Sequence, residues 1–214
     1  ARRFGELEVH PFLRNNDERP ELVRFAKDTD TAGYENGWHH DVTWREIPSK
    51  GAVLRAIQVP ETGGDTLFCD MNAAYEGLSD ELKDRLEGLV AEHDYMQAFG
   101  HTIAGTDGEA MREKYPVVEH PVVIRHPISG NRLLYVNRFF TTRIVGLDPA
   151  ESDALLVTLF AQANILEYHC RLHWHPNSIA MWDNLAVQHY ASSDYWPDVR
   201  VMERASIVGV RPSF

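Results

Sequence analysis

Short runs of β-branched and aromatic residues, each followed by a turn signal, are the feature that most constrains how this chain can fold. The turn signals are Thr-Gly-Gly-Asp at 62–65, Pro-Ile-Ser-Gly at 127–130 and Asp-Asn at 183–184. Runs of this length and composition are typical of strands rather than of long helices. They predict strands at Trp38–Trp44, Ala52–Val59, Thr66–Cys69, Val122–Arg125, Leu133–Val136, Ser178–Trp182 and Val201–Val210.

Two helices are expected between the strands. Ser79 is a favourable N-cap for a helix that runs to about Glu92, with leucines at three- and four-residue spacing. Asp148 and Pro149 open a second helix, since proline is well tolerated in the first turn. Many strands and two helices predict a mainly β fold with flanking helices, arranged as an antiparallel barrel or sandwich.

The size and charge of the chain limit what kind of protein it can be. Its 214 residues fit one domain with a substantial core. Acidic residues outnumber basic ones by 32 to 21 and the net charge is −11, which argues against nucleic acid as a partner. No stretch is apolar enough for a membrane span. Cys69 and Cys170 fit two reduced thiols, so a cytoplasmic location is predicted.

Imidazole and carboxylate groups indicate a candidate metal site. On a strand, residues two apart point to the same face, so His39 and Asp41 would project together. They are two of the three ligands of a facial metal triad, and His189 can supply the second imidazole. His-x-Asp often occurs by chance, and a surface pair on a strand is the alternative interpretation.

Two arginines that are four residues apart follow His189 in the sequence. On one strand, Arg200 and Arg204 would turn to the same face. Guanidinium groups inside a barrel are costly unless each meets an anion, so the pair indicates an anion-binding site. The alternative is two exposed arginines paired with nearby acidic residues.

Six ordered blocks of sequence carry a resemblance to a known family. They read WHHDVTW at 38–44, TGGDTLF at 62–68, AAYEGLS at 73–79, HPVV at 120–123, FTTRIVGL at 140–147 and IAMWDNLAVQHYA at 179–191. The chain closely resembles the taurine dioxygenase family of 2-oxoglutarate-dependent oxygenases, which includes alkylsulfatase and phenoxyacetate dioxygenases. The resemblance implies a double-stranded β-helix, or jelly roll. Members of this family begin upstream of Ala1, so residues 1–214 are expected to be a single dioxygenase domain without the N-terminal part of the family fold.

The resemblance also implies a set of cofactors. His39, Asp41 and His189 would be the ligands of Fe(II). Arg200 would bind the distal carboxylate of 2-oxoglutarate, and Thr66 would add a hydrogen bond to it. Three protein ligands leave room on the metal for the keto acid and for O2.

Residues around the expected substrate position are implied in the same way. His10 and Arg204 match the positions that hold the sulfonate in taurine dioxygenase, and both can bind a sulfonate, sulfate or carboxylate. Phe99 and Phe140 match aromatic residues of the substrate pocket, and ordinary core packing is an equally good interpretation of each.

Two positions depart from taurine dioxygenase. Leu13 stands where that enzyme has a tyrosine, and Glu35 stands where it has an asparagine; both family residues contact the amino group of taurine. Leu13 favours a head group with an alkyl or aryl tail, whereas Glu35 could pair with an ammonium group or point to solvent.

The predicted reaction is hydroxylation of a small anionic substrate, giving succinate and CO2 from the co-substrate. An organosulfonate or alkyl sulfate would yield an aldehyde plus sulfite or sulfate. The alternatives are a hydroxylase of an aryloxy or amino acid, a hydrolase or isomerase with zinc or manganese, and a non-catalytic metal-binding protein or sensor. The paired roles of Thr66 and Arg200 argue against a hydrolase. A homo-oligomer is expected, with Tyr195 and Trp196 as candidates for its interface.

Overall fold

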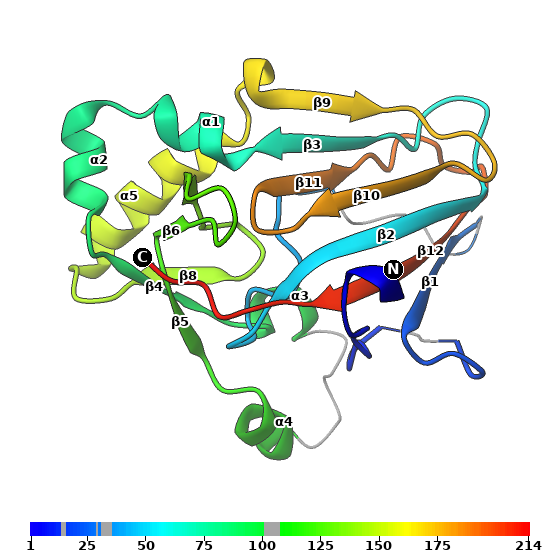
Figure 1. Cartoon of the computed structure of the whole chain (residues 1–214), viewed down its shortest axis with the longest axis horizontal. Helices are drawn as coiled ribbons and strands as arrows, with labels where there is room; N and C mark the ends of the chain where they lie inside the picture. The colour runs from blue at the N-terminus through cyan, green and yellow to red at the C-terminus, as the bar shows by residue number, and fades with distance from the viewer. Residues whose placement is uncertain (14–15, 29, 31–35, 101–107) are drawn as a thin grey trace.

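The computed structural model describes residues 1–13, 16–28, 30, 36–100 and 108–214. The described residues contain more strand than helix, and three of the helices gather at one end (Figure 1). This arrangement confirms the predicted mainly β class with flanking helices. No helix in the described ranges is long and apolar enough to cross a bilayer.

The larger sheet contains β12, the strand that carries Arg200 and Arg204. Its strand order is β1-β12-β2-β10, and each neighbouring pair is antiparallel. The β12 strand lies between β1 and β2, so its side chains alternate between the interior and the outer face. The strands are β1 (Leu22–Lys27), β2 (Ser49–Gln58), β10 (Ile179–Asp183) and β12 (Arg200–Val208).

A second, three-stranded sheet faces the first. Its order is β11-β3-β9, with β3 (Thr66–Asp70), β9 (His169–Leu172) and β11 (Val187–Ala191). Phe68 on β3 packs against Trp182 on β10, with ring centroids 5.5 Å apart. Part of the interior between the two sheets is an apolar cluster, in which Trp174, Trp182 and Met202 are buried. The two sheets therefore form a sandwich.

The helices cover one end of this sandwich. Each is capped by the side chain immediately before it: Asp70, Ser79 and Asp148 each accept hydrogen bonds from the first turn of the helix that follows. Their apolar faces share a core with two small sheets at that end. The three helices are α1 (Met71–Glu76), α2 (Asp80–Leu86) and α5 (Pro149–Gln162).

Shorter elements complete the described chain. One small sheet has the order β5-β4-β8, and the other pairs β6 with β7. The α3 helix ends at Phe99, which lines the cavity described below. These elements are η1 (Arg2–Phe4), β4 (Val90–His93), α3 (Met96–Phe99), α4 (Gly108–Lys114), β5 (Val118–Pro121), β6 (Val123–Arg125), β7 (Arg132–Leu134), β8 (Thr141–Ile144) and η2 (Leu166–Tyr168).

One predicted strand is wrong. Within 38–44, only His39 makes an isolated bridge, and the chain from Asp41 onward is a turn in which Val42 has a φ of 50°. The β-branched and aromatic composition favoured a strand, but contacts with a distant segment determine this conformation. The other predicted strands are present with shifted ends.

The predicted helix from Ser79 is correct at its start and wrong at its end. It stops at Leu86, and Gly88 adopts a left-handed conformation with a φ of 73°. Residues Val90–His93 then pair with β5 and β8 as a strand. The leucine spacing favours a helix through this segment, but the backbone pairing of Val90–His93 with β5 and β8 decides its conformation. The helix predicted to open at Asp148 and Pro149 is confirmed.

Adjacent positions of α5 offer a test of this packing. Leu156 is 4% exposed in the core at the helical end, whereas Val157 is 63% exposed. We expect Leu156→Ala to lower the free energy of unfolding by about 2–5 kcal/mol, because it leaves a cavity. Val157→Ala should change it by less than about 0.5 kcal/mol. Urea denaturation of both variants measures the difference, and equal effects would contradict the observed orientation of α5.

Candidate metal centre

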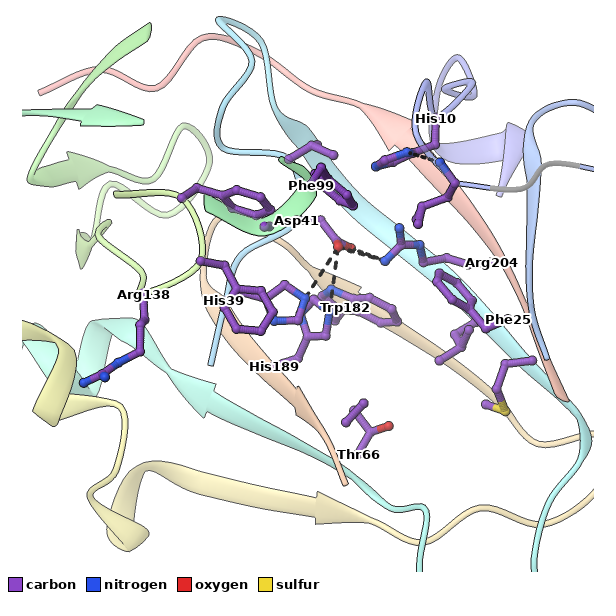
Figure 2. Close-up of a pocket in the computed structure, with 18 of the residues that line it drawn as sticks. His10, Phe25, His39, Asp41, Thr66, Phe99, Arg138, Trp182, His189 and Arg204 are labelled. Atoms are coloured by element: carbon purple, nitrogen blue, oxygen red, sulfur yellow. Dashed lines mark hydrogen bonds and ion pairs between the residues drawn. The ribbon is translucent and has the colours of Figure 1, made fainter. Parts of the chain in front are cut away.

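His39, Asp41 and His189 converge at one point between the sheets (Figure 2). Nε2 of His39 and Nε2 of His189 each lie 3.9 Å from Oδ1 of Asp41. The three side chains are buried, and one ligand atom from each lies within 4.8 Å of the other two. Two imidazoles and one carboxylate on one side of a point fit a facial triad, with the opposite side open to other ligands.

Main-chain pairing brings the two histidines together. The His39 N–H donates to the His189 carbonyl at 3.1 Å, and the His189 N–H donates to the His39 carbonyl at 2.9 Å. His189 lies on β11, an edge strand, so this bridge fixes the segment before Asp41 against the edge of the second sheet. The predicted grouping of the three residues is observed. The reason given for His39 and Asp41 is wrong, because Asp41 reaches the site through a turn.

A buried asparagine holds that turn in place. Oδ1 of Asn184 accepts the Asp41 N–H at 2.7 Å, and its Nδ2 donates to the Asp41 carbonyl at 3.0 Å and the Ser49 carbonyl at 2.8 Å. The predicted turn at Asp183-Asn184 is confirmed, since Asp183 accepts from the two residues that follow Asn184. The reach of Asn184 to Asp41 was missed, and no local sequence signal marks it.

The histidine protons are arranged for metal binding. Nδ1 of His39 lies 2.9 Å from the Gly37 carbonyl, which can only accept, so the ring proton is on Nδ1 and the lone pair on Nε2 faces Asp41. Phe139 stacks on this ring at 4.7 Å, and a Cβ at Gly37 would overlap Phe139. Burial lowers the pKa of His189 well below its ordinary value, so this ring is a neutral ligand at physiological pH.

Arg204 contacts the carboxylate of the triad. Its Nη1 lies 2.8 Å from both oxygens of Asp41, and both side chains are buried (Figure 2). Burial by itself would raise the pKa of Asp41, but the opposing effect of Arg204, followed by those of His189 and His39, outweighs burial and holds the pKa well below its ordinary value. Asp41 is therefore an anion, as a metal ligand must be.

A cavity of about 560 Å³ opens beside the triad, between the two sheets. Glu35 lies outside the described residues. The other predicted site residues all line the cavity: His10, Leu13, His39, Asp41, Thr66, Phe99, Phe140, His189, Arg200 and Arg204. Lining residues that the sequence did not indicate include Phe25, Lys27, Leu54, Arg138, Trp182 and Met202.

Arg200 and Thr66 lie together in the cavity wall. Nη2 of Arg200 is 3.5 Å from the Thr66 hydroxyl, and its Nε donates to the Gly64 carbonyl at 3.0 Å. The indole N–H of Trp174 donates to the same hydroxyl at 3.0 Å. Since the hydroxyl oxygen accepts from both, its own proton can be donated to an anion in the cavity.

His10 presents a hydrogen-bond donor to the same cavity. Its Nδ1 accepts from the Phe12 N–H at 3.2 Å and the Leu13 N–H at 3.1 Å, so the ring proton is on Nε2. Burial, and then the nearby Arg204, lower the pKa of His10 to about 3. The neutral ring therefore acts through its N–H rather than through a full charge.

Comparison with known proteins identifies the protein family of this chain. Residues 1–206 match the family described as "Taurine catabolism dioxygenase TauD, TfdA family". The chain belongs to this family. It is 33% identical over 216 residues to an alkylsulfatase of Acinetobacter baylyi, covering 98% of this chain and 67% of that protein. It is 37% identical over 221 residues to an (S)-phenoxypropionate/alpha-ketoglutarate-dioxygenase of Sphingobium herbicidovorans, covering 98% and 76%.

A solved structure agrees with the sequence relatives. A taurine dioxygenase from Burkholderia xenovorans superposes with a TM-score of 0.81 at 34% identity, covering 98% of this chain and 69% of that one. The predicted jelly roll and the predicted class, an oxidoreductase of the 2-oxoglutarate-dependent dioxygenases, are therefore confirmed. Enzymes of this class use Fe(II), 2-oxoglutarate and O2, and the observed triad fits that metal.

The contact between Asn184 and the Asp41 turn can be tested by metal binding. We expect Asn184→Ala to weaken Mn(II) affinity by about 10- to 100-fold, because Asp41 loses two main-chain hydrogen bonds and Ser49 loses one. Anaerobic calorimetric titration measures the affinity. Asn131→Ala, on the exposed side of the 127–131 turn, is the matched control and should leave affinity unchanged. Unchanged affinity in a folded Asn184→Ala variant would show that Asn184 does not orient the ligand.

Proposed function

We propose that this protein hydroxylates a small organosulfate or organosulfonate that carries an apolar tail, with 2-oxoglutarate as co-substrate. One observation carries the proposal: Arg204 and His10 direct anion-binding groups into a cavity beside the His39–Asp41–His189 triad, and part of the wall of this cavity is apolar. Family membership supports the reaction class, and the cavity supports the kind of substrate.

The metal and co-substrate would be held at the triad side of the cavity. His39, Asp41 and His189 would bind Fe(II), while Arg200 and the Thr66 hydroxyl would bind the distal carboxylate of 2-oxoglutarate. A guanidinium matches a carboxylate in shape and charge, which favours this assignment of Arg200. When bound, iron and 2-oxoglutarate supply the oxidation: O2 is consumed, succinate and CO2 are released, and one oxygen atom enters a substrate C–H bond.

The substrate head group would meet Arg204 and His10. Arg204 already contacts Asp41, so an anion bound by the remaining N–H groups of Arg204 would lie close to the metal. His10 would donate its Nε2 proton to the same anion. Two donors on one head group would set which carbon of the substrate lies beside the metal.

The tail would occupy the apolar part of the cavity. Leu13, Phe25, Leu54, Phe99 and Phe140 all line it. Leu13 provides no hydrogen-bonding group for an amine such as that of taurine, whereas it suits a hydrocarbon chain. Hydroxylation of the carbon that bears the sulfate oxygen, or the sulfur, gives a product that collapses to an aldehyde with release of sulfate or sulfite.

An aryloxy carboxylate is a second candidate substrate. The Sphingobium herbicidovorans relative is named for phenoxypropionate, and Phe25, Phe99 and Phe140 offer aromatic surfaces to a ring. A carboxylate can also accept from Arg204 and His10. A substrate panel that contains both classes separates the two candidates.

The co-substrate assignment predicts a spectroscopic result. Under anaerobic conditions, 2-oxoglutarate added to the Fe(II)-loaded protein should produce a weak visible charge-transfer band. The band should be lost in His39→Ala, which removes a ligand, and should need far higher 2-oxoglutarate concentrations in Arg200→Ala. A well-folded, iron-loaded protein that gives no band would favour the hydrolase or sensor interpretations.

The apolar tail is tested at Leu13. Leu13→Tyr adds volume and a hydroxyl at the wall of the cavity. We expect kcat/KM for hexyl sulfate to fall about tenfold or more, because overpacking an apolar pocket costs about 1–3 kcal/mol. The affinity for 2-oxoglutarate, which binds at Arg200, should not change. Wild-type protein that turns over taurine faster than hexyl sulfate would contradict the proposed tail.

A further inference from the structure

Lys27 is a cavity residue with no role in the function proposed above. It is the last residue of β1 and stands directly opposite Arg200, the first residue of β12, in the antiparallel register. Residues opposed in this way place their side chains on the same face, with Cβ atoms about 4.5–5.5 Å apart. Both side chains are buried, at 8% and 7% exposure, and both line the cavity.

The alternation along β1 shows that Lys27 points inward. Phe25, two residues earlier, also lines the cavity and stands opposite Met202. Arg24 points to the opposite face of β1 from Phe25 and Lys27. It is exposed and pairs with Glu203 at 3.2 Å on the outer face. The chain thus places an ammonium group on the face of β1 that packs toward the interior.

Basic side chains outnumber acidic ones among the described residues that line the cavity, although the chain as a whole has a net charge of −11. Among the described lining residues, the basic ones are Lys27, Arg138, Arg200 and Arg204, and the acidic one is Asp41. Asp41 is already in contact with Arg204 at 2.8 Å. Lys27 and Arg200 thus place two basic side chains on one face of a strand pair at the cavity wall, a placement that suits an anion.

The cationic groups separate into two places along β12. Arg204 lies beside Asp41 and the triad, whereas Arg200 lies four residues away, with Lys27 opposite it and Thr66 close by. Four residues of an extended strand span about 13 Å. A dicarboxylate that reaches the metal with one end would therefore present its other end to Arg200 and Lys27 rather than to Arg204.

We propose that Lys27 is a second co-substrate-binding residue, which together with Arg200 holds the distal carboxylate of 2-oxoglutarate. The inference rests on the proposed function. Arg200 offers a planar fork with fixed directions, and Lys27 adds a compact charge on a flexible stem. Together they make the site selective for keto acids that carry a second carboxylate.

The test compares two keto acids in the anaerobic Mn(II)-loaded protein by calorimetric titration. 2-Oxoglutarate has the distal carboxylate, and 2-oxopentanoate has a methyl group in its place. Lys27→Met keeps the length of the side chain and removes its charge. We expect it to weaken 2-oxoglutarate binding by about tenfold to one-hundredfold and to leave 2-oxopentanoate binding unchanged.

Two further variants control for charge and folding. Lys27→Arg retains a cation and should keep 2-oxoglutarate affinity within a few-fold of the wild-type value. Arg24→Met removes a cation from the outer face of the same strand and should have no effect on either keto acid. Thermal unfolding followed by circular dichroism establishes that each variant is folded.

Each outcome bears on a different claim. Wild-type protein that does not bind 2-oxoglutarate overturns the proposed function, and the inference with it. If the wild type binds and Lys27→Met binds equally well, only the inference is wrong. Equal loss of both keto acids would show a structural role for Lys27. Loss of alkyl sulfate binding alone would assign Lys27 to the substrate instead, and either of these results overturns the inference.

Discussion

The reciprocal main-chain bridge between His39 and His189 is the interaction on which the rest of the site depends. It joins the irregular segment around His39 to β11 at the edge of the second sheet. Two imidazoles from distant parts of the sequence therefore meet at a defined spacing. The buried amide of Asn184 extends this arrangement through two hydrogen bonds to the main chain of Asp41 and one to the Ser49 carbonyl. The triad is therefore positioned by the backbone, which is less adaptable than side-chain packing.

The electrostatics of the site follow from burial between two sheets. A buried imidazole loses the hydration that stabilises its charged form, so His10 and His189 are neutral. A buried carboxylate would also favour its neutral form, but Arg204 lies 2.8 Å from Asp41 and keeps it ionised. One anion and several cations thus remain in a cavity with apolar walls, which suits a metal, a dicarboxylate and an anionic substrate.

Much of the framework could be predicted from local signals. The caps at Ser79 and Asp148 and most of the predicted strands are where the sequence indicates, because hydrogen bonding by caps and the two-residue alternation of strands act over a few residues. The errors lie where a distant partner decides. Segment 38–44 has the composition of a strand, yet a bond from Asn184 makes it a turn. Val90–His93 comes directly after leucines at helical spacing, which predict a helix, yet pairing with β5 and β8 makes it a strand.

The sequence by itself determined the family, the fold class, the ligand residues and the two arginines, since these depend on residue identity at recognisable spacings. Only the tertiary structure decided that Asp41 enters from a turn, that Asn184 holds it, and that Arg204 contacts its carboxylate. It alone placed Lys27 opposite Arg200, because strand register joins residues that are 173 positions apart in the sequence. Such contacts depend on how strands pair in space, and the local pattern of the chain does not contain that information.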